Sequence, residues 1–338
     1  MQHSLRRAAA LLLAALLLLL PLAGCGGSSP APSAGQEDAP LKVVCTVFPL
    51  YDWARRVIGD AEGVELTLLL EGGTDLHSYQ PTAQDMLTIS GADLFFYVGG
   101  ASDSWVEEVL AQTPKEGRAE LSAMELLKDD LLLTEEQGAL HIHDKTHDHS
   151  HPHGEDHPTE EYDEHVWLSL KNARSLCTAL ARELARLDGP NGGLYEENAA
   201  AYGQQLLELD TRFEETVAAA PGKNILVGDR FPFAYLARDY GLTCYAAFSG
   251  CSSESEASFE TVAFLAATLE EKALPAVLVL ENSDGKLART VAENTSRPDC
   301  PVLELNSLQS VTGEQMEEGA TYLSLMESNL EVLARALG

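Results

Sequence analysis

The sequence predicts an α/β protein with two Rossmann-like lobes, each built on a parallel sheet, joined by one long rigid helix. First, β-rich segments alternate with amphipathic helical segments in both halves of the chain, which is the pattern of a parallel sheet flanked by helices. Second, residues 194–220 are helix formers without proline, and Gly203 is the single glycine among them. At ~1.5 Å per residue this helix would be about 40 Å long, longer than a small domain is wide. A single continuous sheet through both halves is the alternative.

The first residues have the pattern of a bacterial export signal. Arg6 and Arg7 precede the apolar run "AAALLLAALLLLLPL", which is shorter than the ~20 residues that span a bilayer. The run ends at "LAGC", which looks like a lipobox, so we expect Cys25 to carry a lipid and to become the mature N-terminus. An ordinary signal peptide is the alternative. We assign 1–25 to a lipoprotein signal peptide and 26–40, rich in Gly, Ser and Pro, to a flexible tether.

The N-terminal lobe is expected over 41–190. Pro49 introduces its first helix and Gly91 closes its second. A His-rich loop, 138–161, interrupts the alternation before the last helix. The expected strands are 41–48, 64–70 and 92–100, and the expected helices are 50–59, 81–91, 104–112 and 171–188.

The C-terminal lobe is expected over 221–338, after the linking helix 194–220. Strand and helix patterns alternate again, which predicts a second parallel sheet. The expected strands are 223–229, 242–248, 276–282 and 301–307, and the expected helices are 231–241, 258–274, 285–295 and 322–337.

The net charge of −31 excludes nucleic acid as the expected partner, because a polyanion gains nothing from an acidic surface. Cations are the favoured ligands of such a chain.

The five cysteines that follow the lipobox show no CxxC or zinc-ribbon spacing, so they do not predict a metal cluster. Cys45 and Cys177 lie in apolar patterns and are expected to be core thiols. Cys244, Cys251 and Cys300 could supply one disulfide in an exported protein, with the pairing left open.

Polar side chains that could bind a cation occur at four places near predicted strand ends, two in each half. They are His77, His165, Asp229, and either Glu281 or Asp284. Ligands of open α/β sheets bind outside the carboxyl ends of strands, so a cleft between the lobes could gather all four. Taken singly, each residue has a simpler explanation, such as a loop hydrogen bond or a helix N-cap. As a set, two imidazoles with one or two carboxylates form a normal ligand set for a divalent cation.

Seven of the ten histidines lie in "HIHDKTHDHSHPHGEDH", 141–157, among acidic and polar residues that cannot form a core. We expect this tract to be an accessory metal binder that raises the local concentration of metal near the site. A solvated linker of biased composition is the alternative. The histidines of the accessory loop are His141, His143, His147, His149, His151, His153 and His157.

With the lipobox, "FPLYDWA", "LLEGGTDLHSYQPTAQD", "DEHVWLSLKNA", "YEENAAAY", "AYLARDYGL" and "YLSLMESNLE", the chain resembles the zinc- and manganese-specific solute-binding proteins of bacterial ABC importers, the cluster A-I family. The resemblance covers essentially all of the mature chain. It implies two α/β lobes bridged by one rigid helix, with the metal held between them and delivered to a membrane permease powered by an ATPase. His77 matches the first family histidine and His165 the second.

The chain departs from the family pattern at the third ligand. Family members place His or Glu where ungapped alignment puts Arg230 of "GDRFPFAYLA". Arginine stays protonated and offers no lone pair, so it cannot coordinate a metal. Either Asp229 replaces it or the position is open. The resemblance matches the fourth ligand best to Asp284, with Glu281 in reserve.

Two further hypotheses concern the metal and the arginine. Two histidines with two carboxylates resemble the manganese members, whereas the His-rich loop is typical of the zinc members; we favour Zn²⁺ over Mn²⁺ because nitrogen-bearing sites bind it more tightly. We expect Arg230 to pair with an acid such as Glu281 or Glu256, offsetting the negative charge of an empty site.

We therefore expect an extracytoplasmic, lipid-anchored and monomeric zinc-binding protein of an ABC importer, which moves little when it loads metal. A zinc-dependent hydrolase is a less favoured reading, because the sequence has no HExxH or GxSxG motif and Glu164 alone could serve as a base. An adhesin or structural surface protein would leave His77 and His165 unexplained. The sequence leaves open whether the cell envelope is Gram-positive or Gram-negative, and how the metal is released.

Overall fold

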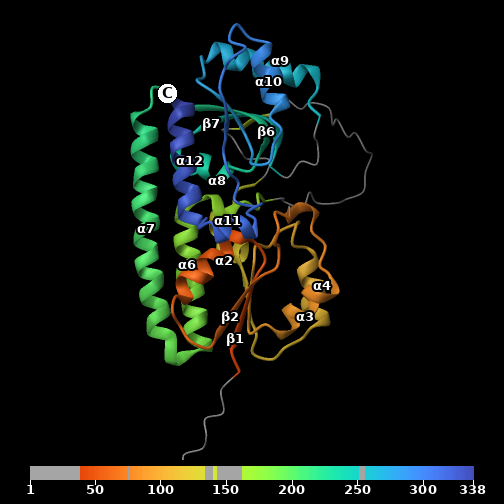
Figure 1. The fold of residues 1–338 in the computed structure, drawn as a ribbon, viewed down its shortest axis with the longest axis vertical. Coiled ribbons are helices and arrows are strands. Elements are labelled where there is room, and N and C mark those ends of the chain that lie inside the picture. Colours follow the sequence, from red (N-terminus) through yellow and green to blue (C-terminus); the bar gives the residue numbers. More distant parts are fainter. Residues whose placement is uncertain (1–38, 75, 134–139, 143–161, 251–255) are drawn as a thin grey trace, which may run out of the picture. The chain divides into compact units, whose positions relative to one another are not determined.

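Two parallel sheets, one in each half of the chain, form the framework of the protein (Figure 1). The computed structural model describes residues 39–74, 76–133, 140–142, 162–250 and 256–338. Within these residues the first sheet has the order β2-β1-β3-β4 and the second the order β5-β7-β6-β8-β9. The prediction of two α/β lobes is confirmed, and the alternative of one continuous sheet is wrong. The export signal, Cys25 and the tract from His143 to His157 lie outside the described residues.

The strands of each sheet pair in parallel, as the strand–helix alternation predicts. The first sheet contains β1 (Leu41–Cys45), β2 (Val64–Leu68), β3 (Leu94–Tyr97) and β4 (Ala119–Ser122). The second contains β5 (Leu140–Ile142), β6 (Asn224–Phe231), β7 (Thr243–Ser249), β8 (Val277–Val279) and β9 (Val302–Glu304).

The helices lie mostly where the apolar periodicity predicts them, and side-chain caps fix several of their starts. The threonine of the α3 cap and the serine of the α9 cap each accept from a backbone N–H in the first turn. The α-helices are α2 (Phe48–Ile58), α3 (Ala83–Gly91), α4 (Trp105–Gln112), α5 (Ala123–Leu126), α6 (Leu170–Leu187), α7 (Gly192–Ala219), α8 (Ala234–Tyr240), α9 (Phe259–Glu271), α10 (Lys286–Glu293), α11 (Gly313–Glu317) and α12 (Tyr322–Leu337). Short 3-10 helices are η1 (Leu76–Ser78), η2 (Lys128–Asp130), η4 (Val166–Leu168) and η5 (Gly189–Asn191).

One long helix, α7, links the two halves. It contains 28 residues and begins two residues before the range that the sequence predicts. It packs against α2 and α6 of the first half and against α8 and α12 of the second half (Figure 1). Its buried face has helical spacing and includes Tyr195, Ala199, Tyr202, Leu206, Leu209, Phe213 and Val217.

The N-terminus of α12 is bound to two elements of the first half. The amide of Tyr322 donates to the buried carboxylate of Asp52 on α2 at 2.9 Å, and the Tyr322 hydroxyl donates to the carbonyl of Trp167 in η4 at 2.6 Å. The rings of Trp53 and Tyr322 meet edge to face, with their centroids 5.1 Å apart. The last helix of the second half is thus locked onto the first half.

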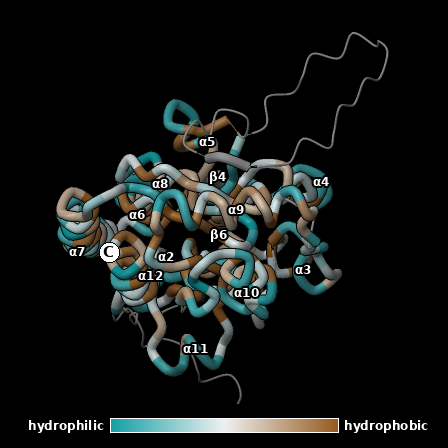
Figure 2. Tube along the Cα trace, turned by 90° about the horizontal axis from the view of Figure 1, so that it is seen from above, coloured by the Kyte–Doolittle hydropathy of each residue, from teal (hydrophilic) through white to brown (hydrophobic). Residues whose placement is uncertain are grey.

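The hydrophobic core runs through both halves. One cluster of buried side chains includes Val43 of the first sheet, Val227 of the second, and Leu206 of α7. In Figure 2, hydrophobic stretches of the chain lie toward the middle of the molecule, and hydrophilic stretches lie on outer parts of α3, α10 and α11. Among the described residues, none of the helices combines the length and the apolar character that crossing a bilayer requires.

Cys45, Cys177, Cys244 and Cys300 are buried free thiols. The two predicted core thiols are confirmed, and Cys244 and Cys300 are not joined to each other. Burial raises the pKa of each of the four thiols above its ordinary value, which keeps them protonated and unreactive. Cys251 lies outside the described residues, and the predicted disulfide is not formed by the described cysteines.

Two strands, β4 and β5, and two short helices, α5 and α11, have no counterpart in the predicted pattern. β4 is only four residues long and contains Glu120, so its sequence has no β-rich run that would reveal it. β5 falls inside the segment assigned to the His-rich loop, yet its backbone pairs with β7, and His141 lies opposite Tyr245. The chain therefore contributes one strand to the second sheet before it continues into η4 and α6 of the first half.

Candidate metal centre

His77 is held by a single turn of 3-10 helix, η1, in the connection that follows β2. Leu76 of this turn is 1% exposed, and its burial in the core fixes the turn against the protein. The Nδ1 atom of His77 lies 2.7 Å from the hydroxyl oxygen of Ser102, which belongs to the loop after β3. The imidazole is therefore oriented from its Nδ1 side, and 15% of its side chain remains exposed.

His165 is fully buried at the start of η4, whose three residues, Val166–Leu168, are also buried. The carboxylate of Asp163 accepts from both the backbone amide of His165, at 2.9 Å, and its Nδ1, at 3.1 Å. Asp163 is itself fixed, because the hydroxyl of Tyr235 on α8 donates to its carbonyl oxygen. The second imidazole thus carries its proton on Nδ1 and presents Nε2 as an acceptor.

The two imidazoles face each other through their Nε2 atoms, which lie 3.3 Å apart. Their ring centroids are 5.2 Å apart and the ring planes are tilted by 57°. With both Nδ1 atoms turned toward oxygen, two Nε2 lone pairs would point into the same space. They repel unless a proton or a cation lies between them, so this pair is poised to hold a positive charge.

The second half of the molecule reaches His165 at the ends of β6 and β7. A Cβ at Gly250 would lie 3.1 Å from Cε1 of His165 and 2.9 Å from the carbonyl oxygen of Phe231. This close approach needs a glycine. The indole of Trp167, whose ring meets that of His165 edge to face, donates to the carbonyl of Ser307 after β9.

A group of acids lies behind the two rings. The Glu164 carboxylate is 2% exposed; Oε1 accepts from the amide of Ser102 at 2.8 Å, and Oε2 lies 3.9 Å from Nδ1 of His77. Burial raises the pKa of the neighbouring Asp103 to about 7; the amide of Gly99 opposes this shift, and the charge of Glu164 adds to it. The sequence prediction of the site does not include Asp163, Ser102 or Asp103. For Asp163, the signal that could have found it is the pair of acidic residues directly before His165.

The predicted carboxylate ligands are engaged elsewhere. Asp229 accepts from the amide of its neighbour Arg230 at 2.8 Å. Asp284 is exposed and accepts from the amide of Lys286, where α10 begins. Both oxygens of Glu281 are hydrogen-bonded to Ser307, through its amide at 2.7 Å and its hydroxyl.

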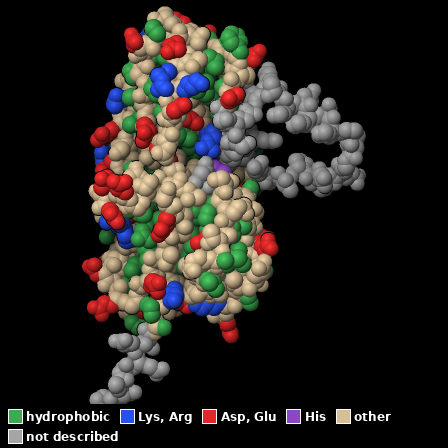
Figure 3. Space-filling model, turned by 45° about the vertical axis from the view of Figure 1, so that its right-hand side comes forward, with side chains coloured by type: hydrophobic (Ala, Val, Ile, Leu, Met, Phe, Trp, Pro, Cys, Tyr) green, Lys and Arg blue, Asp and Glu red, His purple; other side chains and the backbone are tan. Residues whose placement is uncertain are grey.

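Of the predicted ligands, the structure therefore brings together His77 and His165. Across the described residues, no three His, Cys, Asp or Glu side chains are grouped closely enough to hold a metal ion. The assignments of Asp229, Asp284 and Glu281 remain predictions, as does the pairing of Arg230 with Glu281 or Glu256. On the face drawn in Figure 3, an imidazole reaches the surface beside a basic side chain, and acidic side chains are spread widely.

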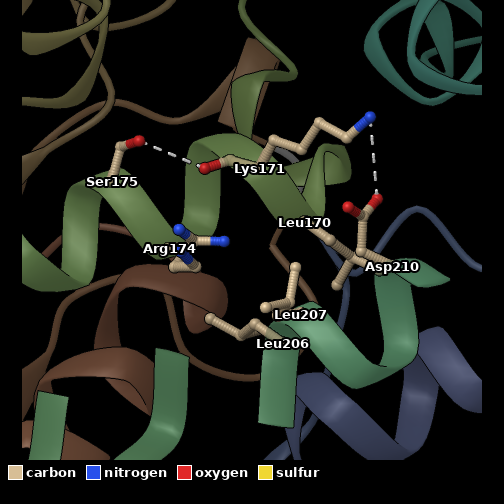
Figure 4. Close-up of a pocket in the computed structure, with 7 residues that line it drawn as sticks. All are labelled: Leu170, Lys171, Arg174, Ser175, Leu206, Leu207 and Asp210. Atoms are coloured by element: carbon tan, nitrogen blue, oxygen red, sulfur yellow. Dashed lines mark hydrogen bonds and ion pairs between the residues drawn. The ribbon is translucent and has the colours of Figure 1, made fainter. Parts of the chain in front are cut away.

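A separate cavity of about 220 Å³ lies between α6 and α7 (Figure 4). Lys171 extends toward Asp210, with Nζ 4.0 Å from Oδ1, and its Nζ also lies 3.1 Å from Oε1 of Glu214. The lysine is matched by acids, and the lining contains one carboxylate and no histidine or cysteine, so this cavity does not offer a metal site. Its lining residues are Leu170, Lys171, Arg174, Ser175, Leu206, Leu207 and Asp210.

Comparison with known sequences identifies relatives along nearly the whole chain. The zinc-binding lipoprotein AdcA of Streptococcus pneumoniae (strain ATCC BAA-255 / R6) is 33% identical over 301 residues, which cover 88% of this chain and 56% of AdcA. This chain thus spans about half the length of that relative. The high-affinity zinc uptake system protein ZnuA of Bacillus subtilis (strain 168) is 29% identical over 318 residues, 94% of each chain.

Solved structures show the same fold. The Zn(II)-bound ZnuA-like domain of S. pneumoniae AdcA superposes with a TM-score of 0.68 at 29% identity, covering 88% of this chain and 99% of that domain. The metal-dependent lipoprotein YcdH of B. subtilis gives a TM-score of 0.70 at 26% identity, covering 88% and 100%. The family model described as "Zinc-uptake complex component A periplasmic" matches residues 43–336. The chain therefore belongs to the family of the periplasmic component A of zinc-uptake complexes.

Proposed function

We propose that this protein captures Zn²⁺ outside the cytoplasm and delivers it to the permease of an ABC importer. The observation that carries the proposal is the separation of 3.3 Å between the Nε2 atoms of His77 and His165. Two nitrogens bound to one zinc at ~2.0–2.1 Å and at a tetrahedral angle lie about 3.3 Å apart. The pair thus has the spacing of two zinc ligands, and the named relatives AdcA and ZnuA are zinc proteins.

The remaining ligands are proposed to come from the second half, in the order of preference given by the sequence: Asp229 and Asp284, with Glu281 in reserve. Asp229 lies two residues before the end of β6, and Glu281 and Asp284 follow β8. The carboxyl ends of parallel strands are where such folds bind ligands. The carboxylate of Asp284 is exposed and, among the described residues, accepts from the backbone amide of Lys286, so its rotation toward a cation would cost little. Among the described residues, the side chain of Asp229 accepts from the amide of the next residue.

The zinc specificity over manganese follows from the same chemistry. Imidazole nitrogen binds Zn²⁺ more tightly than Mn²⁺, and this chain offers two preoriented imidazoles. In an equimolar competition we expect zinc to displace manganese completely from the tight site.

Transport, rather than hydrolysis, suits the placement of Glu164. A general base must reach a water bound to the metal, but Glu164 approaches His77 from its Nδ1 side, 3.9 Å away, and not from the side where the Nε2 atoms meet. The partners proposed are the permease and its ATPase. The protein is proposed to act as a monomer, lipid-anchored through Cys25 on the extracytoplasmic face of the membrane.

The histidines of the tract are proposed as an accessory binder. His141 belongs to β5, so a deletion that tests this role should begin after Ile142. We would replace residues 143–157 by a Gly/Ser linker of equal length and titrate zinc in competition with a chelator. One tight site that survives the replacement, with the weaker sites lost, is the expected result.

The deciding experiment is the same titration on His77→Ala and His165→Ala, with Gln205→Ala at an exposed position of α7 as the control. Loss of tight binding in the first two variants and its retention in the control would support the site. If His77→Ala and His165→Ala both bind one zinc as tightly as the unaltered protein, the proposal is wrong.

A further inference from the structure

The carboxylate of Glu164 is buried beside His77 with one oxygen unused. Its side chain is almost fully enclosed, and Oε1 is occupied by the amide of Ser102. Among the described residues Oε2 has no hydrogen-bond partner, and Nδ1 of His77 lies 3.9 Å from it. A buried carboxylate oxygen without a donor is costly, so a structure that keeps one calls for an explanation.

The loop after β3 is shaped to admit this carboxylate. Gly100 has φ +85°, a conformation that favours glycine, and a Cβ there would lie 2.6 Å from Oε1 of Glu164. Any larger residue at this position would collide with the acid. The close approach of backbone and carboxylate is therefore a local requirement of the fold and fixes where Oε2 lies.

The position of Oε2 bears on which nitrogen of His77 carries the proton. A neutral imidazole can bind a cation through Nε2 only if its proton is on Nδ1. The Ser102 hydroxyl, 2.7 Å from Nδ1, can either donate or accept, so it selects neither tautomer. An ionised carboxylate can only accept, so Glu164 favours the proton on Nδ1.

Each of the two imidazoles thus has one of two consecutive acids on its Nδ1 side. Asp163 accepts directly from Nδ1 of His165 at 3.1 Å, and Glu164 lies on the Nδ1 side of His77. The residues from 163 to 165 have no regular helical structure, which lets neighbouring side chains serve different rings. Resting on the proposed zinc function, we propose that Glu164 is a positioning residue that holds a proton on Nδ1 of His77, so that Nε2 is the atom that binds the cation.

The first test needs no metal. In the purified, metal-free full-length protein, labelled with ¹⁵N at its histidine rings, the His77 signals are assigned by their loss in His77→Asn. Nitrogen chemical shifts above the imidazole titration range report the tautomer. The proposal expects a proton on Nδ1 of His77, with or without a second proton between the two Nε2 atoms; a His77 ring that is protonated on Nε2 alone would overturn it.

The second test replaces the carboxylate of Glu164, which only accepts hydrogen bonds, by an amide that can also donate. In Glu164→Gln the amide can still accept from Ser102 through its oxygen, which turns its NH₂ group toward Nδ1 of His77 and favours the proton on Nε2. The His77 ring is expected to change tautomer, and zinc affinity in a chelator competition to fall by about 10- to 100-fold. Glu107→Gln removes the same charge from an exposed position on α4 and serves as the matched control.

The outcomes separate the two proposals. If Glu164→Gln keeps the tautomer and the zinc affinity of Glu107→Gln, the role of Glu164 is refuted while zinc binding stands. If the unaltered protein binds no zinc tightly, the transport proposal is lost, and the tautomer measurement still decides what Glu164 does.

Discussion

At the scale of single residues, the site depends on the acids that orient its two imidazoles. Asp163 accepts from both the amide and Nδ1 of His165, so Asp163→Asn should release the ring and offer it a competing donor. Because such outer hydrogen bonds contribute roughly 10- to 100-fold to metal affinity, we expect a loss of that size. Chelator competition with zinc measures it, and Asp129→Asn, at an exposed position, is the control. Equal affinities for the two variants would contradict the prediction.

Asp103 should make the stability of the metal-free protein depend on pH. Burial raises its pKa from 3.8 to about 7, so between these values the folded state holds a proton that the unfolded state has lost. This contribution to stability is complete below pH ~4 and falls as pH rises toward 7, by about 1.4 kcal/mol for each unit of pKa difference. Asp103→Asn cannot titrate, so its thermal midpoint relative to the unaltered protein should rise between pH 4.5 and 7.5. Parallel curves for the two proteins would refute this assignment.

The sequence reveals the site residues only in part. His77 and His165 stand out because they are histidines at strand-end loops of a predicted α/β fold, and the structure places their rings together. Asp163 and Ser102 do not stand out, since their roles depend on which ring nitrogen they face, and no local pattern encodes that distance. The carboxylates of the second half were chosen by chain position, but each has a backbone amide as a competing partner.

At the scale of elements, two buried glycines should respond to the same substitution with opposite signs. At Gly203 in α7 a Cβ would meet Cγ of Arg174 at 3.3 Å, and this exposed, flexible side chain can move. Gly203→Ala should therefore stabilise the protein by roughly 0.5–1 kcal/mol, the difference in helix propensity. At Gly228 in β6 a Cβ would lie 2.9 Å from the backbone of Ala288, which cannot yield. Gly228→Ala should destabilise by about 1–3 kcal/mol.

Thermal unfolding of both variants beside the unaltered protein is the measurement. A fall in the midpoint for Gly203→Ala, or no fall for Gly228→Ala, would show that the packing of α7 or of β6 against α10 differs from the structure described.

Long periodic elements were predictable and short ones were not. The sequence predicts α7 within two residues at each end, because 28 residues repeat the same apolar spacing. β4 and β5 escape detection because three or four residues carry no period. Their places in the sheets are set by tertiary pairing with β3 and β7.

At the scale of the whole molecule, the halves are tied by α7 and by the N-terminus of α12. The hydrogen bonds of Tyr322 to Asp52 and to the carbonyl of Trp167 join them within two residues of His165. Domain closure would have to break these buried contacts. We expect zinc to change backbone positions by about 1 Å or less, as in preorganised complexes. Solution scattering with and without zinc measures the radius of gyration, and a large compaction would contradict the expectation.

The pairing of β5 also places the start of the proposed accessory tract close to the metal centre. Ile142, the last residue of β5, pairs with Ala246 on β7. Ala246 precedes Gly250, the neighbour of His165, by four residues, or about 13 Å of strand. A metal ion released at the β5 end of the proposed accessory tract would therefore have only a short distance to diffuse to the imidazole pair.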